Sequence, residues 1–163
     1  MITYEEYFVN LIKEATKTLN LDLQKIDSQS GFITFTINDV NMFAPVIRLA
    51  GGARFRVFYD VLNISFEPND YDLIFQVNKL IHHFNLFEGG LTQLILVEDE
   101  LGRETPVFKA IDICLSDDAV NNEYINEYHL NLVADVISVA SRMEYYRVNY
   151  LNKLESLGYT GKN

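Results

Sequence analysis

The sequence predicts a single α+β domain over residues 1–163, with an antiparallel sheet flanked by helices. Apolar residues recur at helical spacing near both ends and in the middle of the chain. Between these segments they alternate with polar residues, or form short runs bounded by turn residues, as is typical of strands. Four strands precede the middle helix and two follow it, so the expected order is α-ββββ-α-ββ-α.

The first helix has a clear N-terminal signal. Thr3 and Glu6 have the spacing of a capping box, in which each side chain binds the backbone N–H of the other residue. We expect this helix to end near Leu19–Asn20. Its core stripe follows the helical period and consists of Phe8, Leu11, Ile12, Ala15 and Leu19.

The next segment is rich in strand signals. Strands are expected at residues 21–26, 33–37 and 42–50, and Pro45 favours an edge position or a bulge for the third. A fourth strand follows the turn at Gly51-Gly52, and its apolar phase shifts by one residue after Asp60, which indicates a bulge or bend. In it Phe55, Val57 and Tyr59 face one side, whereas Arg54, Arg56 and Phe58 face the other.

The second half of the chain predicts a helix and then a hairpin. Pro68-Asn69 opens the middle helix and Gly89-Gly90 ends it. Its core stripe is Leu73, Val77, Leu80, Ile81 and Phe84. Strands at residues 92–97 and 107–115 are close enough in sequence to pair as a hairpin. Cys114 falls within the second of these strands, where a buried thiol is expected.

The last helix is predicted to be unusually long. Residues 116–118 provide its cap, apolar residues keep helical register from Glu123 to Leu157, and Gly158 ends it. At ~1.5 Å per residue such a helix approaches 50 Å. A compact domain of this size has a radius of gyration of only ~15 Å. We therefore expect its last third, with Tyr145, Tyr146 and Tyr150, to need another surface to cover it.

Composition and charge exclude several kinds of partner. Acidic residues outnumber basic ones by 23 to 13, for a net charge of -10, so a broad nucleic-acid-binding face is not expected. A single cysteine allows no internal disulfide and fits a reducing compartment. The N-terminal stretch MITYEEYFVN lacks the basic residues of a signal peptide, and no apolar run is long enough to span a membrane. We expect a cytoplasmic protein.

No catalytic or metal-binding motif stands out. The four carboxylates of VEDELGRETP, residues 97–106, lack the ligand order of a calcium loop and suit a solvated hairpin tip. His82 and His83 are adjacent, whereas a zinc-binding helix needs histidines four residues apart. No nucleophile motif surrounds a serine or the cysteine. We therefore predict a protein that is not an enzyme and has no metal or cofactor; a pocket of convergent polar groups would be needed for catalysis.

Three stretches carry a resemblance to a known family: SGFITFTIND, NDYDLIFQVNKLIHHFNLFEGG and LILVEDELGRETPVFKAIDICLSDD. With the order of elements, they resemble the YbjN-type family, whose fold is like that of class I type III secretion chaperones. The middle helix of that family typically carries an asparagine where Asn78 stands. The resemblance spans about residues 1–145 and implies a non-catalytic protein, often a homodimer, that binds other polypeptides. The tyrosine-bearing C-terminus departs from the family pattern.

The leading functional hypothesis is therefore a polypeptide-binding module of chaperone-like or adaptor type. Its candidate binding residues are Arg48, Arg54, Arg56, Phe58, Tyr145, Tyr146 and Tyr150. Arg48 is expected near Arg54 and Arg56 across the turn at Gly51-Gly52, where three guanidinium groups could hold a carboxylate-rich or phosphate-bearing partner. The alternative is that these arginines pair with the acidic residues of the chain itself.

A second hypothesis uses the acidic residues instead. Between Lys109 and Arg142 the chain has no basic residue but carries Asp112, Asp117, Asp118, Glu123, Glu127 and Asp135. This run could simply solubilise the protein. It could also form the active surface of a small acidic inhibitor, such as an immunity or phage anti-defence protein, that occupies a basic groove on its target.

Overall fold

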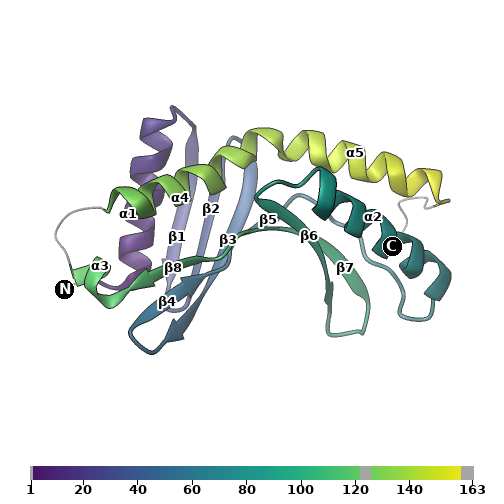
Figure 1. The fold of residues 1–163 in the computed structure, drawn as a ribbon, viewed down its shortest axis with the longest axis horizontal. Coiled ribbons are helices and arrows are strands. Elements are labelled where there is room, and N and C mark those ends of the chain that lie inside the picture. Colours follow the sequence, from purple (N-terminus) through teal and green to yellow (C-terminus); the bar gives the residue numbers. More distant parts are fainter. Residues whose placement is uncertain (1, 122–125, 159–163) are drawn as a thin grey trace.

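The structure, a computed structural model, describes residues 2–121 and 126–158 and confirms the α+β fold with an antiparallel sheet (Figure 1). Five strands precede the middle helix and three follow it, one more in each block than predicted. In chain order the elements are α1 (Tyr4–Thr18), β1 (Leu23–Gln29), β2 (Phe32–Ile37), β3 (Val40–Leu49), β4 (Gly52–Phe55), β5 (Phe58–Asp60), α2 (Tyr71–Phe87), β6 (Thr92–Glu98), β7 (Glu104–Ala110), β8 (Ile113–Ser116), α3 (Asp117–Asn121), α4 (Glu127–Ser138), the 3₁₀ helix η1 (Val139–Arg142) and α5 (Met143–Ser156).

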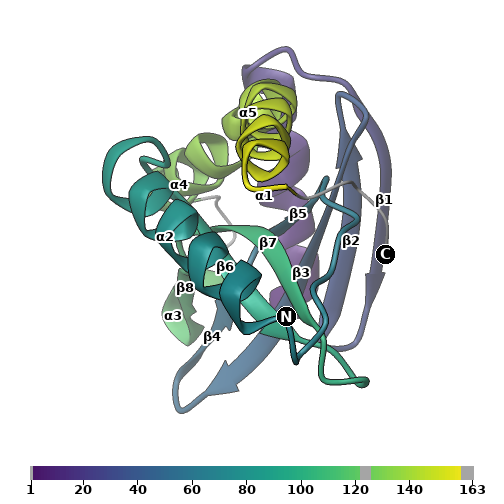
Figure 2. The same ribbon diagram turned by 90° about the vertical axis from the view of Figure 1, so that its right-hand side faces the viewer.

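The sheet is strongly curved and the helices lie inside its curve (Figure 2). Its strands follow the order β1-β2-β3-β5-β7-β6, and every pairing is antiparallel. The long strand β3 also pairs with β4, which in turn pairs with β8. The inner face carries the core. Phe8 of α1 stacks on Phe55 of β4 at 4.1 Å between ring centroids, and Phe108 of β7 packs against α5.

Strand β3 is central, so the edge position expected from Pro45 is wrong. One side of β3 pairs with β2 over residues 40–45. On the other side its partner changes from β5, opposite residues 41–43, to β4, opposite residues 46–49. Pro45 lies at this change, where its missing N–H removes no ladder hydrogen bond, and its carbonyl accepts a hydrogen bond from the N–H of Arg56.

Two predicted strands are each divided into two. The fourth strand breaks at Arg56-Val57 into β4 and β5, and the predicted strand 107–115 breaks at Ile111-Asp112 into β7 and β8. Both β4 and β5 pair with β3, but on their other side β4 pairs with β8 and β5 pairs with β7. Cys114 consequently lies on the exposed side of β8, directly opposite Arg54, and the expectation of a buried thiol is wrong. Its neighbours Ile113 and Leu115 point into the core instead.

The ends of α1 and α2 follow from local sequence. The capping box of α1 is present: Glu6 N–H donates to Thr3 Oγ1 at 3.1 Å, and Thr3 N–H donates to the Glu6 carboxylate at 2.9 Å. Helix α2 starts two residues later than the predicted Pro68-Asn69, because the side chain of Asp70 accepts from the N–H of Leu73 and is the N-cap. Of the predicted core stripe of α2, Val77, Ile81 and Phe84 are buried, while Leu73 and Leu80 are partly buried against the core.

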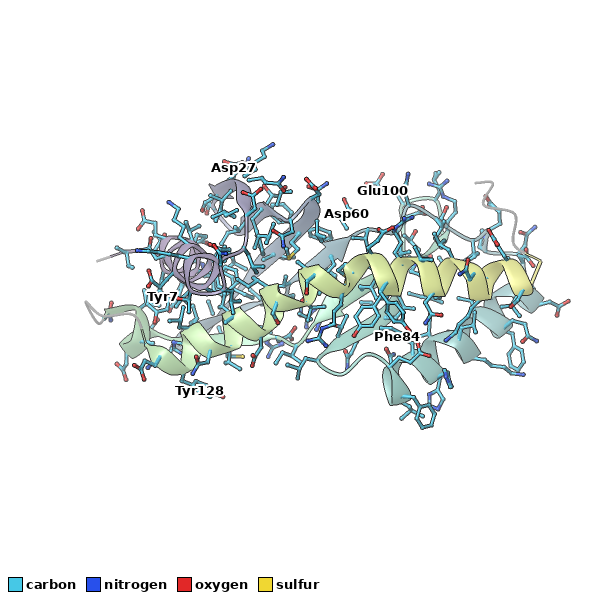
Figure 3. The ribbon with its side chains drawn as sticks, turned by 90° about the horizontal axis from the view of Figure 1, so that it is seen from above. Tyr7, Asp27, Asp60, Phe84, Glu100 and Tyr128 are labelled. Atoms are coloured by element: carbon cyan, nitrogen blue, oxygen red, sulfur yellow. The ribbon has the colours of Figure 1, made fainter. Side chains whose placement is uncertain are left out.

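The predicted long helix is not one continuous α-helix. Ser116 Oγ accepts from the N–H of Ala119 and therefore caps the short α3, whereas Asn126 caps α4. The predicted start at Glu123 lies outside the described residues. From residue 127 to residue 156 the chain is helical, but η1 interrupts the α-helical pattern between α4 and α5. Together these three elements run along the length of the molecule (Figure 3). Within the described residues, no helix combines the length and apolarity that a bilayer crossing requires.

Candidate interaction surface

The outer face of the sheet carries a row of phenylalanines. In register, Phe43 of β3 lies opposite Phe58 of β5, and their rings stack with centroids 5.0 Å apart. Phe32 of β2 extends the row, with its ring centroid 6.0 Å from that of Phe43. Phe32 is 38% exposed and the other two are half-buried. This row is called the phenylalanine row below.

The phenylalanine row ends at a group of charges. Phe58 lies opposite Lys109 of β7 on the same face. The Lys109 ammonium is 2.7 Å from the Asp112 carboxylate, at the break between β7 and β8. The Nε atoms of Arg56 and Arg54 are 3.5 Å and 3.9 Å from the same carboxylate. Arg54, Arg56, Lys109 and Asp112 form what is called the cation cluster below.

The cation cluster is incompletely satisfied by its own residues. Three cations share one carboxylate, so positive charge is in surplus. The contacts of both arginines with Asp112 are longer than an ordinary hydrogen bond. Arg56 Nε is shielded from water and makes no hydrogen bond within the described residues. The sequence placed Arg54, Arg56 and Phe58 on one face of a strand, and the structure brings them together there.

Arg48 does not join the other two arginines. It lies opposite Ala53, whose side chain points into the core, so Arg48 projects from the inner side of β3. There its guanidinium donates to both carboxylate oxygens of Glu5, at 2.8 Å and 3.2 Å. Its Cζ atom is also 5.0 Å from the ring centroid of Tyr4. The expectation that Arg48 lies beside Arg54 and Arg56 is therefore wrong, because residues 48 and 54 are on opposite faces of the sheet.

The three tyrosines of the C-terminal helix also separate. Tyr146 and Tyr150 are buried in the protein's own core, with Tyr146 edge-on to Phe84 at 5.2 Å and Tyr150 edge-on to Phe108 at 6.4 Å. Figure 3 shows Phe84 beside α5. Only Tyr145, at 68% exposure, is open to a partner. The expectation that this stretch needs a second molecule to cover it is thus wrong for two of the three rings, because α2 and β7 cover them.

Sequence reasoning missed an apolar stripe on the outer side of α2. The buried residues of this helix follow the predicted core stripe, and on the opposite side exposed apolar residues lie at both ends of the helix, separated by Lys79, His82 and His83. Phe75 and Leu86 are 60% and 61% exposed. The whole stripe consists of Tyr71, Phe75, Leu86 and Phe87. Helical periodicity did not single these residues out, because exposed Lys79, His82 and His83 lie between Phe75 and Leu86 on the same side of the helix.

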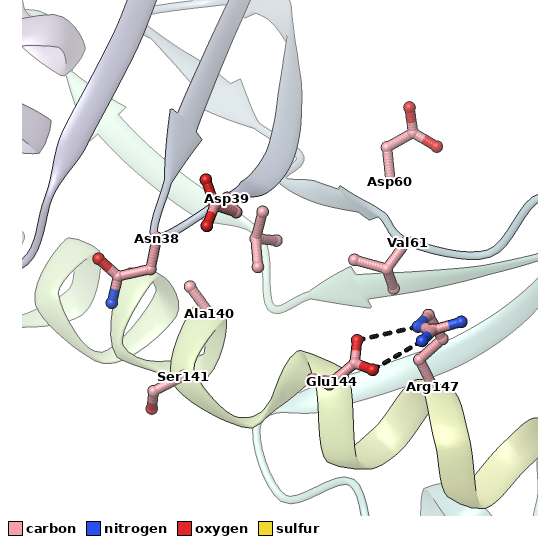
Figure 4. Close-up of a pocket in the computed structure, with 9 residues that line it drawn as sticks. Asn38, Asp39, Asp60, Val61, Ala140, Ser141, Glu144 and Arg147 are labelled. Atoms are coloured by element: carbon pink, nitrogen blue, oxygen red, sulfur yellow. Dashed lines mark hydrogen bonds and ion pairs between the residues drawn. The ribbon is translucent and has the colours of Figure 1, made fainter.

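A groove of about 630 Å³ lies between the β2–β3 turn, the end of β5 and the start of α5 (Figure 4). Its acidic side chains are already engaged in part. The Glu144 carboxylate binds the guanidinium of Arg147 at 2.6 Å and 3.0 Å, and Asp39 accepts from the Gln24 amide at 2.7 Å. The Arg147 hydrogen bond holds the pKa of Glu144 below its usual value. Ser141, which also lines the groove, donates its hydroxyl to the Ser138 carbonyl at 2.8 Å.

The acidic hairpin stretch organises its own turn. The Asp99 carboxylate accepts from the backbone N–H groups of Leu101 and Arg103 and from Arg103 Nε, each at 2.8–2.9 Å. Desolvation alone would raise the pKa of Asp99, but these hydrogen bonds outweigh it and lower the pKa. Gly102 supplies the positive φ of +75° that the turn needs. Among the described residues, no three His, Cys, Asp or Glu side chains converge as metal ligands.

Asp112 lies apart from the other acidic residues of the inhibitor hypothesis that the structure describes. Asp112 is on the outer face of the sheet, where it is bound by the cation cluster. Asp117 and Asp118 are exposed on α3, and Asp135 is exposed on α4. Glu123 lies outside the described residues. Asp112 therefore does not add to the negative surface that would face a basic groove.

The chain matches no family model, and comparison with curated proteins and with solved structures found no match.

Proposed function

We propose that this protein is a non-catalytic, cytoplasmic polypeptide-binding module of chaperone-like or adaptor type that acts as a homodimer. The main support is the outer face of the sheet. The helices pack on the inner face, through pairs such as Phe8–Phe55 and Phe84–Phe108. The outer face is left with the phenylalanine row and, next to it, the cation cluster.

Physical chemistry favours a protein ligand for such a face. Contiguous aromatic side chains beside charged groups are typical of protein interfaces, where an apolar centre supplies affinity and polar neighbours set orientation. Phe43 and Phe58 are also fixed by the strands that carry them, so little side-chain entropy is lost on binding. The order of elements, which resembles that of the YbjN-type family, favours the same function.

The binding proposal is tested by capturing partners from the native host with the tagged protein and then purifying the captured protein. Calorimetry should give a dissociation constant that weakens about tenfold or more for Phe43→Ser, as expected for a central interface aromatic. Tyr128→Ser is the matched control, because Tyr128 is an exposed aromatic on α4, away from the sheet. Equal affinities for wild type and Phe43→Ser would contradict the proposal.

The homodimer proposal has support of its own in the outer stripe of α2. Large apolar side chains exposed at both ends of a helix favour its packing against another surface. Exposed Tyr71 and Phe75 lie in the first turns of α2, and Leu86 and Phe87 lie in its last turn. A second copy of α2, running antiparallel, would place the two ends of the stripe against each other.

Sedimentation analysis tests the dimer. The wild type should sediment as a dimer at micromolar concentration, and the double variant Phe75→Ser/Leu86→Ser should sediment as a monomer with an unchanged circular dichroism spectrum. The reason is that both side chains would leave water on association. A wild type that stays monomeric at millimolar concentration, or a double variant that remains dimeric, would show that α2 is not the interface.

A further inference from the structure

The cation cluster differs from the other ion pairs of the described residues. Elsewhere each paired arginine or lysine has a carboxylate within 2.8 Å: Arg48 has Glu5, Arg103 has Asp99, Arg147 has Glu144, and Lys153 has Glu88, which also lies 3.6 Å from His83 Nε2. On the outer face, Asp112 alone serves three cations, and only Lys109 is within 3 Å of it. This surplus is notable in a chain with a net charge of -10. The local charge therefore suits an anionic group from outside the chain.

The cation cluster and the phenylalanine row form one continuous strip. Phe43 lies opposite Phe58, and Phe58 lies opposite Lys109, on three neighbouring strands. The ring centroids along the row are 5.0 Å and 6.0 Å apart. Alternate side chains of an extended polypeptide are spaced at roughly 6.6 Å, which is close to this separation. An extended segment could therefore place one side chain on each ring.

We propose that the outer face binds an extended, acidic segment of the partner polypeptide. A carboxylate of the segment binds between Arg54, Arg56 and Lys109, and apolar side chains that follow it pack on Phe58 and Phe43. The guanidinium groups are open to such a ligand, since the side chains of Arg54 and Arg56 are 35% and 42% exposed. This inference rests on the proposed polypeptide-binding function and adds the chemical class of the ligand.

Single-stranded nucleic acid also stacks on aromatic rings and binds cations, but it fits this face less well. A nucleic-acid strand carries a phosphate at each nucleotide and needs cations along its whole path. Here Arg54, Arg56 and Lys109 lie at one end of the phenylalanine row. Beside Phe43 the outer face carries, among the described residues, a single cation, Lys25 of β1, next to Thr34 and Asp60. An acidic peptide, with one anionic side chain followed by apolar side chains, therefore fits this face better than a nucleic-acid strand does.

The single cysteine allows a direct test. Cys114 is exposed on the outer face and lies opposite Arg54, so an environment-sensitive fluorophore on its thiol reports binding at the cation cluster. Three probes are titrated: a synthetic peptide with two aspartates followed by phenylalanines at alternate positions, the same peptide with asparagines for the aspartates, and a uridine decanucleotide. The acidic peptide should bind about tenfold or more tightly than its asparagine version, because charge-assisted hydrogen bonds are lost from the latter.

Variants of the cation cluster should change the affinity in opposite directions. Arg54→Gln/Arg56→Gln should weaken the acidic peptide about tenfold. Asp112→Asn should strengthen it by about fivefold, because it removes the carboxylate that competes with the ligand. A merely structural role of Asp112 would not give tighter binding. Lys13→Gln/Lys17→Gln, which removes two exposed cations from α1, is the matched control and should leave the affinity unchanged.

Several results would overturn the inference. These are no binding of the acidic peptide, equal affinity for the acidic and asparagine peptides, no gain in Asp112→Asn, or a decanucleotide that binds as tightly as the acidic peptide. The captured partner separates this failure from that of the proposed function. If its binding is lost in Phe43→Ser but unchanged in Arg54→Gln/Arg56→Gln, only the acidic class of ligand is wrong. If neither variant affects it, the outer face is not the binding surface.

Discussion

At the residue scale, the pair Glu5–Arg48 shows how a charge is retained inside the fold. Glu5 is only 4% exposed, and its carboxylate accepts hydrogen bonds from Arg48 and from the N–H of Gly31. A buried carboxylate is costly unless such partners satisfy it. The pairing joins residues 43 positions apart, which periodicity cannot reveal, whereas the capping box of Thr3 and Glu6 was predictable because it is local.

Replacement of Arg48 should therefore affect stability and not partner binding. Arg48→Met leaves the Glu5 carboxylate buried with fewer donors and should lower the free energy of unfolding by about 1–3 kcal/mol. The double variant Glu5→Gln/Arg48→Met should be less destabilised, because no charge remains to be satisfied. Urea unfolding measures both. If Arg48→Met is as stable as wild type but fails to bind the captured partner, Arg48 belongs to the binding surface.

At the element scale, one asparagine explains how the edge of the sheet is closed. The side chain of Asn85, on α2, donates to the carbonyl of Leu94 at 3.0 Å and accepts from its N–H at 2.7 Å. These backbone groups of β6 point away from β7 and would otherwise be open to another strand. The family resemblance draws attention to Asn78, but that residue is exposed, and the structural role belongs to the asparagine seven positions later.

Asn85→Ala should destabilise the protein by about 1–3 kcal/mol, since two backbone groups of β6 lose their partners. It should also increase aggregation on heating, because the edge of β6 becomes available for pairing. Thermal unfolding followed by light scattering measures both effects. Asn78→Ala is the control on the same helix and should behave like wild type. Similar behaviour of the two variants would mean that α2 protects β6 by packing alone.

At the scale of the whole molecule, the alternation of apolar and polar residues predicted which side chains are buried better than it predicted the topology of the sheet. Phe55, Val57 and Tyr59 are buried as expected, and Arg54, Arg56 and Phe58 point the other way. What alternation cannot predict is which side of a sheet the helices cover, or where a strand changes partner. Those depend on contacts between distant segments, such as the hydrogen bond from the Tyr59 hydroxyl to the Val136 carbonyl at 2.6 Å.

The same limit applies to the candidate binding residues. Tyr146 and Tyr150 were expected at a surface because the predicted helix outran the predicted sheet. The real sheet extends further, since β7 and β6 continue beyond β5 and Phe108 of β7 contacts Tyr150 of α5. The exposed stripe of α2 and the cation cluster around Asp112 became visible only when the fold brought separate strands and helices together.

The central claim is that the outer face of the sheet is where this protein holds its polypeptide partner. Photocrosslinking tests it most directly. A benzophenone is attached to Cys114, on the outer face, or to Lys17→Cys in a Cys114→Ser background, on α1. After irradiation with the captured partner, we expect a covalent complex from position 114 and little from position 17. Crosslinking from α1 with none from Cys114 would contradict the account.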